Sequence, residues 1–243
     1  MRIPLILFNL CLILVGCQQN SKINEEAEAQ DIDLNIVRFD RQFAQTSVEE
    51  LPQLKNTYPE LFPDHIPDSL WINKLQSDLQ KEIHTEVQAA FPDFEEESKR
   101  IERFFKYVKY HFPSYKIPTV YTLAEEVNYR TKLVLSENKL LISLDNYLGE
   151  DHKFYESFPR YIAFQQDKKF LISDIARVFI QQQLNPKRAR PFISEMVYHG
   201  KILYLKDMLM PFESDAAKIY YSEDELKWAE DNEEEIWSFF VER

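Results

Sequence analysis

Few side chains in this 243-residue sequence stand at spacings that could support catalysis or metal binding. Zinc peptidases place two imidazoles one helical turn apart, as in His-Glu-x-x-His, and no pair of histidines here has that spacing. The nearest half-site is Glu195 with His199, which would share one face of a helix. We expect this pair to be a surface contact and predict no metal site. The dispersed histidines are His65, His84, His111, His152 and His199.

Other common catalytic groups are also missing from the sequence. The glycines are Gly16, Gly149 and Gly200, which cannot build a Gly-x-Ser-x-Gly nucleophile elbow or a glycine-rich phosphate loop. The cysteines, Cys11 and Cys17, both lie near the N terminus. We therefore predict no catalytic residue, no cofactor and no nucleotide, and we expect a protein that is not an enzyme.

Cys17 is the residue to which the sequence assigns definite chemistry. It follows an apolar run from Ile3 to Val15 that begins after the positive charge of Arg2. Thirteen residues suit the core of a signal peptide, whereas a membrane-spanning helix needs about 20 apolar residues. Cleavage after Gly16 would remove Cys11 and leave Cys17 without a disulfide partner, so the retained cysteine must serve another purpose.

The segment Leu14-Val15-Gly16-Cys17 resembles the lipobox of bacterial lipoproteins. The resemblance implies that the Cys17 thiol takes a diacylglyceryl group, that the bond before it is cut, and that the new amine is acylated. Such a cysteine would supply the two lipid signals that stable anchoring requires. We predict a cleaved signal peptide over residues 1–16 and a lipid anchor at Cys17; an uncleaved helical anchor or a coincidental cysteine is the alternative.

Composition limits the binding partners and the number of domains. A formal net charge of -12 disfavours nucleic acid and anionic lipid head groups. Residues 17–33 are polar and acidic, which predicts a flexible tether after the lipidated cysteine. The remaining residues, 34–243, are enough for a single globular domain.

Apolar spacing predicts an α+β fold that is mostly helical, with a small antiparallel sheet or hairpin near the middle packed by helices. Aliphatic segments at 119–123, 132–135 and 140–144 are typical of strands, and residues 136–139 suit a hairpin loop. A capping box at Ser222 and Glu225 predicts that a last helix begins there and runs almost to Arg243. Other helices are expected from Asp68 or Ser69 to before Pro92, from 95 to 112, from 172 to 184, and from Phe192 to Leu209.

Charged and aromatic clusters have ordinary structural interpretations. The acidic runs 95–97 and 231–235 are expected to be solvated helix faces. Residues 187–190 form a compact basic patch, which we interpret as a solvent loop, with contact to an acidic partner as the alternative. Aromatic residues in the last 50 positions are expected mainly in the core, with a partner surface as the alternative.

The C-terminal half resembles the gliding motility lipoprotein family GldB, most clearly in the segments 144–149, 158–162, 174–177, 195–205 and 228–233. The resemblance implies an envelope lipoprotein needed for gliding motility and its associated secretion machinery, with protein partners there and no enzymatic activity. Placement on the outer membrane facing the periplasm is expected. Family members typically continue past the position of Arg243, so a domain shortened at its C terminus is also expected.

The same resemblance extends distantly to putative zinc peptidases, which implies a degenerate zincin-like domain. Residues 173–177 would occupy the first metal-binding helix, and His199 with Gly200 the second, with both imidazoles and the later carboxylate replaced. The protein would then be a non-catalytic, metallopeptidase-like scaffold. The alternative is a metal-dependent envelope hydrolase or peptidase that uses Asp174, Glu195 and His199.

Overall fold

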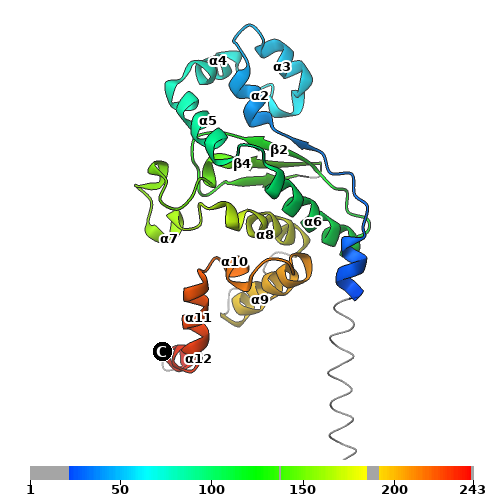
Figure 1. Cartoon of the computed structure of the whole chain (residues 1–243), viewed down its shortest axis with the longest axis vertical. Helices are drawn as coiled ribbons and strands as arrows, with labels where there is room; N and C mark the ends of the chain where they lie inside the picture. The colour runs from blue at the N-terminus through cyan, green and yellow to red at the C-terminus, as the bar shows by residue number, and fades with distance from the viewer. Residues whose placement is uncertain (1–21, 137, 185–191, 242–243) are drawn as a thin grey trace, which may run out of the picture.

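The computed structural model describes residues 22–136, 138–184 and 192–241 (Figure 1). Within these residues, helices surround a sheet of four strands in the order β1-β2-β4-β3. This arrangement confirms the predicted α+β, mostly helical class. The strands are β1 (Ile36–Val37), β2 (Thr119–Leu123), β3 (Leu133–Leu135) and β4 (Lys139–Ser143).

The sheet is mixed, which corrects the prediction of an antiparallel sheet. β3 and β4 form the expected antiparallel hairpin, with Leu133 opposite Ile142. β2, however, pairs with β4 in parallel, and β1 pairs with β2 in parallel. The helices between β1 and β2 provide the long crossover that a parallel pair requires. Strand composition gives no sign of which neighbours pair, so the sequence could not predict this arrangement.

The sheet separates two hydrophobic cores because successive strand residues point to opposite faces. Val120 and the alternate β4 residues Leu140 and Ile142 enter the larger core, together with side chains of α5 (Asp78–Ala90), α6 (Glu95–His111), α8 (Leu171–Gln183) and α9 (Phe192–Leu209). Tyr121 enters a smaller core on the other face, and Leu141 packs against it. The smaller core also contains side chains of the helices that precede α5.

A helical cap covers the smaller core at one end of the molecule (Figure 1). The single helix predicted from Asp68 to before Pro92 is broken at Ser77, whose extended backbone ends one helix and whose hydroxyl caps the next. The serine thus acts as an N-cap in the middle of a continuous apolar pattern. The cap contains α2 (Phe39–Gln45), α3 (Leu51–Thr57), the 3-10 turn η1 (Pro59–Leu61), α4 (Asp68–Gln76) and the start of α5 (Asp78–Ala90).

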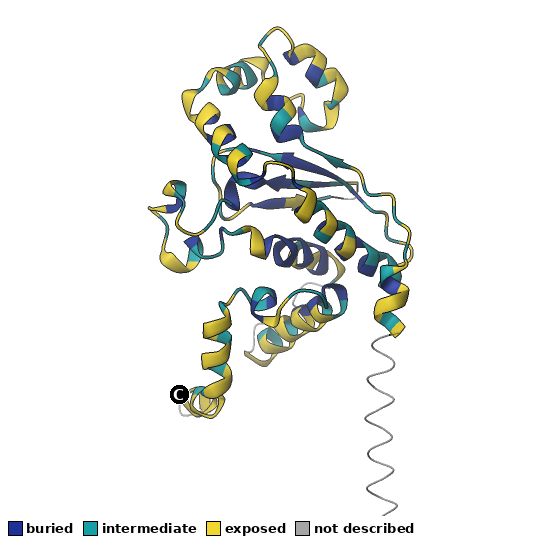
Figure 2. Ribbon diagram, in the orientation of Figure 1, coloured by how far each residue is buried: buried dark blue, intermediate teal, exposed yellow. Residues whose placement is uncertain are grey.

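Two helices pack against the other face of the sheet. α6 (Glu95–His111) has acidic residues in its first turn and basic residues in its last, which complements the helix dipole. α8 (Leu171–Gln183) is the most deeply buried helix, and it lies between the sheet and α9 (Figure 2). Short elements lead from β4 to α8: η2 (Leu144–Asn146), η3 (Lys153–Tyr155), α7 (Arg160–Ala163) and η4 (Lys168–Phe170).

The C-terminal helices pack on α6 and α8 through one side of α9 (Phe192–Leu209). The short α10 (Asp215–Ile219) leads to α11 (Glu223–Asp231), which begins with the predicted capping box of Ser222 and Glu225. The predicted last helix is interrupted at Asn232, after which α12 (Glu233–Val241) follows. Neither α11 nor α12 buries a residue completely (Figure 2). In the described ranges, the helices are all too short or too polar to cross a bilayer.

Part of the predicted tether is ordered against the domain. Residues 22–28 form a helix whose Ala27 is fully buried, and Tyr110 donates a hydrogen bond to Glu26 at 2.9 Å. Arg103 of α6 also forms an ion pair with Glu28. The acidic residues from which a tether was expected therefore bind basic and phenolic side chains of α6.

Candidate functional site

The residues proposed from sequence for metal chemistry do not form one site. Glu195 and His199 lie on α9, where their side chains are 36% and 67% exposed and 3.8 Å apart. Asp174 is buried on α8. Across residues 22–136, 138–184 and 192–241, His, Cys, Asp and Glu form no group of three able to hold a metal ion. Cys17, the rest of the lipobox and the basic patch at 187–190 lie outside the described residues.

Asp174 is the centre of a buried polar cluster, which we call the Asp174 cluster. Lys132 and Tyr147 donate hydrogen bonds to its Oδ2 at 3.2 and 2.9 Å. Arg177 and Tyr220 donate to its Oδ1 at 2.9 and 2.8 Å. These donors come from the segment before β3, from the chain after η2, from α8 itself and from the end of α10. The carboxylate therefore joins the sheet region to the C-terminal helices.

The charge of Asp174 is fixed by these neighbours. Burial alone would raise the pKa of this carboxyl, but the positive charges of Lys132 and Arg177 and the two phenol donors outweigh burial. The pKa of Asp174 is consequently held below its usual value. A carboxylate with two cations and two hydroxyls already bound has no lone pair positioned for an additional ligand.

A third cation, Lys206 of α9, adds to the positive charge around Asp174. Its ammonium lies 4.4 Å from the ring centre of Tyr220 and donates to the carbonyl of Lys218 at 2.5 Å. Burial and, to a smaller extent, the charge of Arg177 together lower the pKa of Lys206 to about 7, although the charge of Asp174 opposes the shift. Three basic side chains around one carboxylate disfavour a divalent metal, so the Asp174 cluster does not fit the metal site that the alternative of a metal-dependent hydrolase would require.

Tyr220 reaches Asp174 from an unusual backbone conformation. It caps the C terminus of α10 with φ of 62°, a left-handed position that normally favours glycine or asparagine. The hydrogen bond to Asp174 and the packing of its ring against Phe170 hold it there. The strained tyrosine thus connects α10 to the Asp174 cluster.

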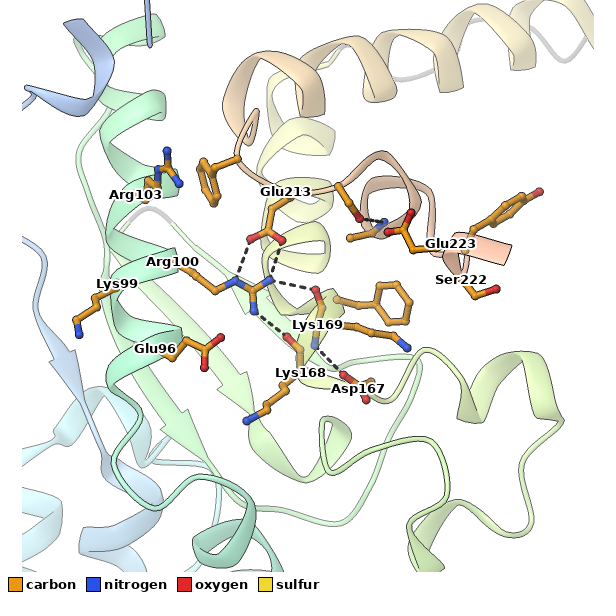
Figure 3. A pocket seen from close by; sticks show the side chains of 15 residues that line it. Glu96, Lys99, Arg100, Arg103, Asp167, Lys168, Lys169, Glu213, Ser222 and Glu223 are labelled. Carbon is orange, nitrogen blue, oxygen red and sulfur yellow. Dashed lines mark hydrogen bonds and ion pairs between the residues drawn. The ribbon is translucent and has the colours of Figure 1, made fainter. Parts of the chain in front are cut away.

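A cleft of about 790 Å³ opens beside this cluster, between α6, η4, α10 and the start of α11 (Figure 3). Arg100 lies in its centre and points toward Glu213, with two hydrogen bonds of 2.9 Å to the carboxylate (Figure 3). The same guanidinium donates to the carbonyls of Lys168 and Lys169 at 3.3 and 3.1 Å. Arg100 therefore fastens α6 to η4 and to the segment before α10.

The other cations of the cleft also have partners within the chain. Lys99 lies 3.7 Å from Glu95, and Lys168 lies 3.8 Å from Glu97. Arg103 is paired with Glu28 and covers the Phe212 ring, and Lys169 covers the rings of Phe164 and Phe170. We interpret the cleft as a junction that holds the C-terminal helices, because its charges already bind neighbouring protein groups.

A comparison with known protein families covers the described domain. Residues 20–243 match the model of the family described as gliding motility protein GldB. The chain belongs to the GldB family. No curated protein and no solved structure matches it. The GldB match covers the Asp174 cluster, the cleft and the helical cap, so each of these is part of the family's domain.

Sequence reasoning did not find most members of the Asp174 cluster in this GldB-family chain. Lys132 is the first residue of the predicted strand at 132–135, and its pairing with Asp174 spans 42 residues. Tyr220 was interpreted only as a core or surface aromatic. The one local signal was Arg177, three residues after Asp174 and therefore on the same helix face.

Proposed function

We propose that this protein is a lipid-anchored envelope component of the gliding motility apparatus and its associated secretion machinery, and that it acts without catalysis. The observation that carries the proposal is the GldB family match over residues 20–243. The lipobox lies immediately before the matched residues, at 14–17. The proposed lipid anchor and the domain are thus close together in the sequence, which is consistent with a membrane-attached component of the motility apparatus.

Anchoring rests on the chemistry of Cys17. Acylation of its thiol and of the new amine would provide two lipid signals, which is sufficient for stable membrane attachment. The residue after the cysteine is Gln18 and is not acidic, which favours placement on the outer membrane, facing the periplasm. The strongly acidic domain adds no attraction to anionic lipid, so attachment depends on the acyl chains.

A role without catalysis is supported by the Asp174 cluster. A metallopeptidase-like helix at 173–177 would need imidazole ligands, but here Arg177 occupies the later position and binds Asp174. A general base or metal ligand also requires a lone pair that substrate or metal can reach. The Asp174 side chain is 2% exposed and accepts four hydrogen bonds from protein groups.

Partner binding is supported by the outer face of α9. An amphipathic surface helix has one apolar side, and a helix that is apolar all round is normally buried. α9 buries Ile202 and Leu209 against the domain, yet its other side also carries large apolar residues that are exposed. These are Phe192, Ile193, Met196, Val197, Leu203 and Tyr204. We propose that a protein of the motility apparatus covers this outer face.

Genetic complementation tests the proposal in a gliding host. Deletion of the gene is expected to abolish colony spreading, and the wild-type gene is expected to restore it. Cys17→Ala should fail to restore spreading because the protein loses its anchor. Val197→Asp should fail because it places a charge on the exposed outer face of α9. Asn56→Asp, which adds a charge to an exposed position of α3, serves as the matched control and should restore spreading.

Normal spreading and secretion in the deletion strain would contradict a motility role. The hydrolase alternative has a separate test, because it needs a bound metal at Asp174, Glu195 or His199. Elemental analysis of the purified protein is expected to show less than stoichiometric zinc. Stoichiometric zinc that is lost in His199→Ala would instead support the hydrolase.

A further inference from the structure

The helical cap encloses a cavity on the face of the sheet opposite α8. It has a volume of about 330 Å³ and lies between α2, α4, α5 and the end of β2. Phe39, Phe43, Trp71, Leu123 and Leu141 supply most of its apolar wall. Pockets that bind small molecules have this character, an apolar wall with a few polar groups, and begin at about this size.

The first polar group of the cavity is His84 of α5, which is 8% exposed. The amide nitrogen of Gln80 lies 3.1 Å from its Nε2 and also donates to the carbonyl of Ala124 at 2.7 Å. Because the amide nitrogen is a donor, Nε2 accepts and the proton of the neutral ring lies on Nδ1. Burial lowers the pKa of His84 to about 4, so the ring is neutral at pH 7. Nδ1 has no acceptor among the described residues.

The second polar group is the indole of Trp71 on α4. Its Nε1 is buried and also has no acceptor in the described part of the chain. The Trp71 and His84 rings lie 6.3 and 6.0 Å from the ring of Phe43, so both donors belong to one aromatic group. Buried N–H groups are paired in the great majority of native structures. Both side chains line the cavity, so these two N–H groups are donors that an acceptor on a ligand would satisfy.

The charges around the cavity favour a neutral ligand. Asp40, Glu60 and Glu125 line it together with Lys74 and Lys139, and Asp40 is paired with Arg38 at 2.8 Å, so the acidic and basic groups balance. Lys74 is already paired with Glu125 at 2.9 Å, and Lys139 donates to the backbone carbonyl of Glu60. A ligand carboxylate would therefore meet paired cations and nearby acids, whereas an uncharged carbonyl would meet only the two donors.

We propose that this cavity binds a small neutral molecule that joins an aromatic or branched apolar group to an amide or ester carbonyl. The carbonyl oxygen accepts a hydrogen bond from the Trp71 indole, with the His84 imidazole as the second donor. The apolar group packs against Phe39, Phe43 and Leu141. This site is separate from the outer face of α9 and does not depend on the motility proposal.

The three tryptophans provide a direct measurement, because each indole N–H gives its own NMR signal and Trp71→Phe assigns one of them. N-phenylacetamide added to the full-length chain is expected to shift the Trp71 signal and to leave Trp228 and Trp237 unchanged. Toluene has no acceptor and benzoate carries a charge, so both should bind more weakly than N-phenylacetamide.

Affinity measured by saturation-transfer NMR completes the test. Trp71→Phe keeps an aromatic ring but removes one donor, and it should weaken N-phenylacetamide binding by about fivefold. Trp228→Phe, on the exposed side of α11, is the matched control and should leave the affinity unchanged. Circular dichroism and a thermal unfolding midpoint close to that of the wild type establish that Trp71→Phe is folded. An unmoved Trp71 signal at millimolar N-phenylacetamide, or equal binding of toluene, would overturn the proposal.

Discussion

Asp174 and Asp145 are both buried carboxyl groups, but they lie in regions of opposite electrostatic character. Asp174 accepts hydrogen bonds from two cations and two phenols, and its pKa is lowered. Asp145, in η2, accepts from the backbone N–H of Glu125 at 2.9 Å and from the Asn146 amide at 3.1 Å. Burial, together with the nearby charge of Glu125, raises the pKa of Asp145 to about 7.

The difference shows that the charge of the donors, more than burial itself, sets the state of a buried acid. Neutral donors at Asp145 do not offset the cost of removing a carboxylate from water. The cations around Asp174 do offset this cost. Because these cations are also buried, they need the negative charge of the carboxylate to offset their own loss of hydration. Asp174 itself is therefore charged at all ordinary pH values, while Asp145 titrates near neutrality.

The largest change in stability is expected for Asp174→Ala. The substitution leaves Lys132 and Lys206 buried without their carboxylate, and we expect the free energy of unfolding to fall by about 3–5 kcal/mol. Urea unfolding followed by circular dichroism measures this change. Asp207→Ala is the matched control, because Asp207 is 62% exposed where it pairs with Lys218, and it should cost less than about 1 kcal/mol. Equal effects of the two variants would refute a special role for Asp174.

The pH dependence of Asp145 should have the opposite sign from that of Asp174. Unfolded Asp145 loses its proton near pH 3.8, while the folded group keeps it until about pH 7. In that window unfolding releases a proton, so stability falls as pH rises, by at most about 1.4 kcal/mol per pH unit. Asp145→Asn should remove this contribution, as urea unfolding between pH 4.5 and 7.5 would reveal. Parallel curves for the wild type and the variant would contradict the raised pKa.

For Asp174, whose pKa is lowered, the contribution to stability is present above about pH 4 and is lost as the pH falls through the folded pKa. Acid titration of wild-type stability should therefore show a loss below pH 4 that is absent in Asp174→Asn. The change in stability below about pH 4 would thus report on Asp174, and the change between pH 4.5 and 7.5 would report on Asp145.

The smallest loss of stability is expected for Arg177→Gln, which compares an exposed cation of the Asp174 cluster with a buried one. The Arg177 side chain is 44% exposed, so water already screens its charge, and the loss should be about 1 kcal/mol or less. Lys132 is 5% exposed, and Lys132→Met should cost more than Arg177→Gln. Thermal unfolding of both variants gives the order, and the reverse order would show that exposure does not control these contributions.

The sequence predicted those features that depend on local spacing. The helix from 95 to 112 and the helix from Phe192 to Leu209 follow from their apolar periodicity, and both are confirmed. The hairpin of β3 and β4 follows from two aliphatic runs with a polar turn. The break at Ser77 was missed because the apolar pattern continues through it, and only the serine cap reveals where α5 begins.

The candidate sites were less predictable because their residues are brought together by tertiary structure. Asp174 meets Tyr147 and Tyr220 across separations of 27 and 46 residues. Trp71 and His84 both fit the apolar stripe of a predicted helix, where a tryptophan or a histidine is most often a core residue. That each has a buried N–H without an acceptor among the described residues emerges only when the surrounding atoms are placed.

The packing of residues 22–28 against α6 would orient the whole molecule if Cys17 carries the proposed lipids. Five peptide units join Cys17 to Lys22, a contour length of at most about 18 Å. The docked helix lies far from α2, α3 and α4 along the molecule, so this short connection would keep the cap on the side away from the bilayer (Figure 1). The cavity would then face the aqueous compartment, where water-soluble molecules could reach it.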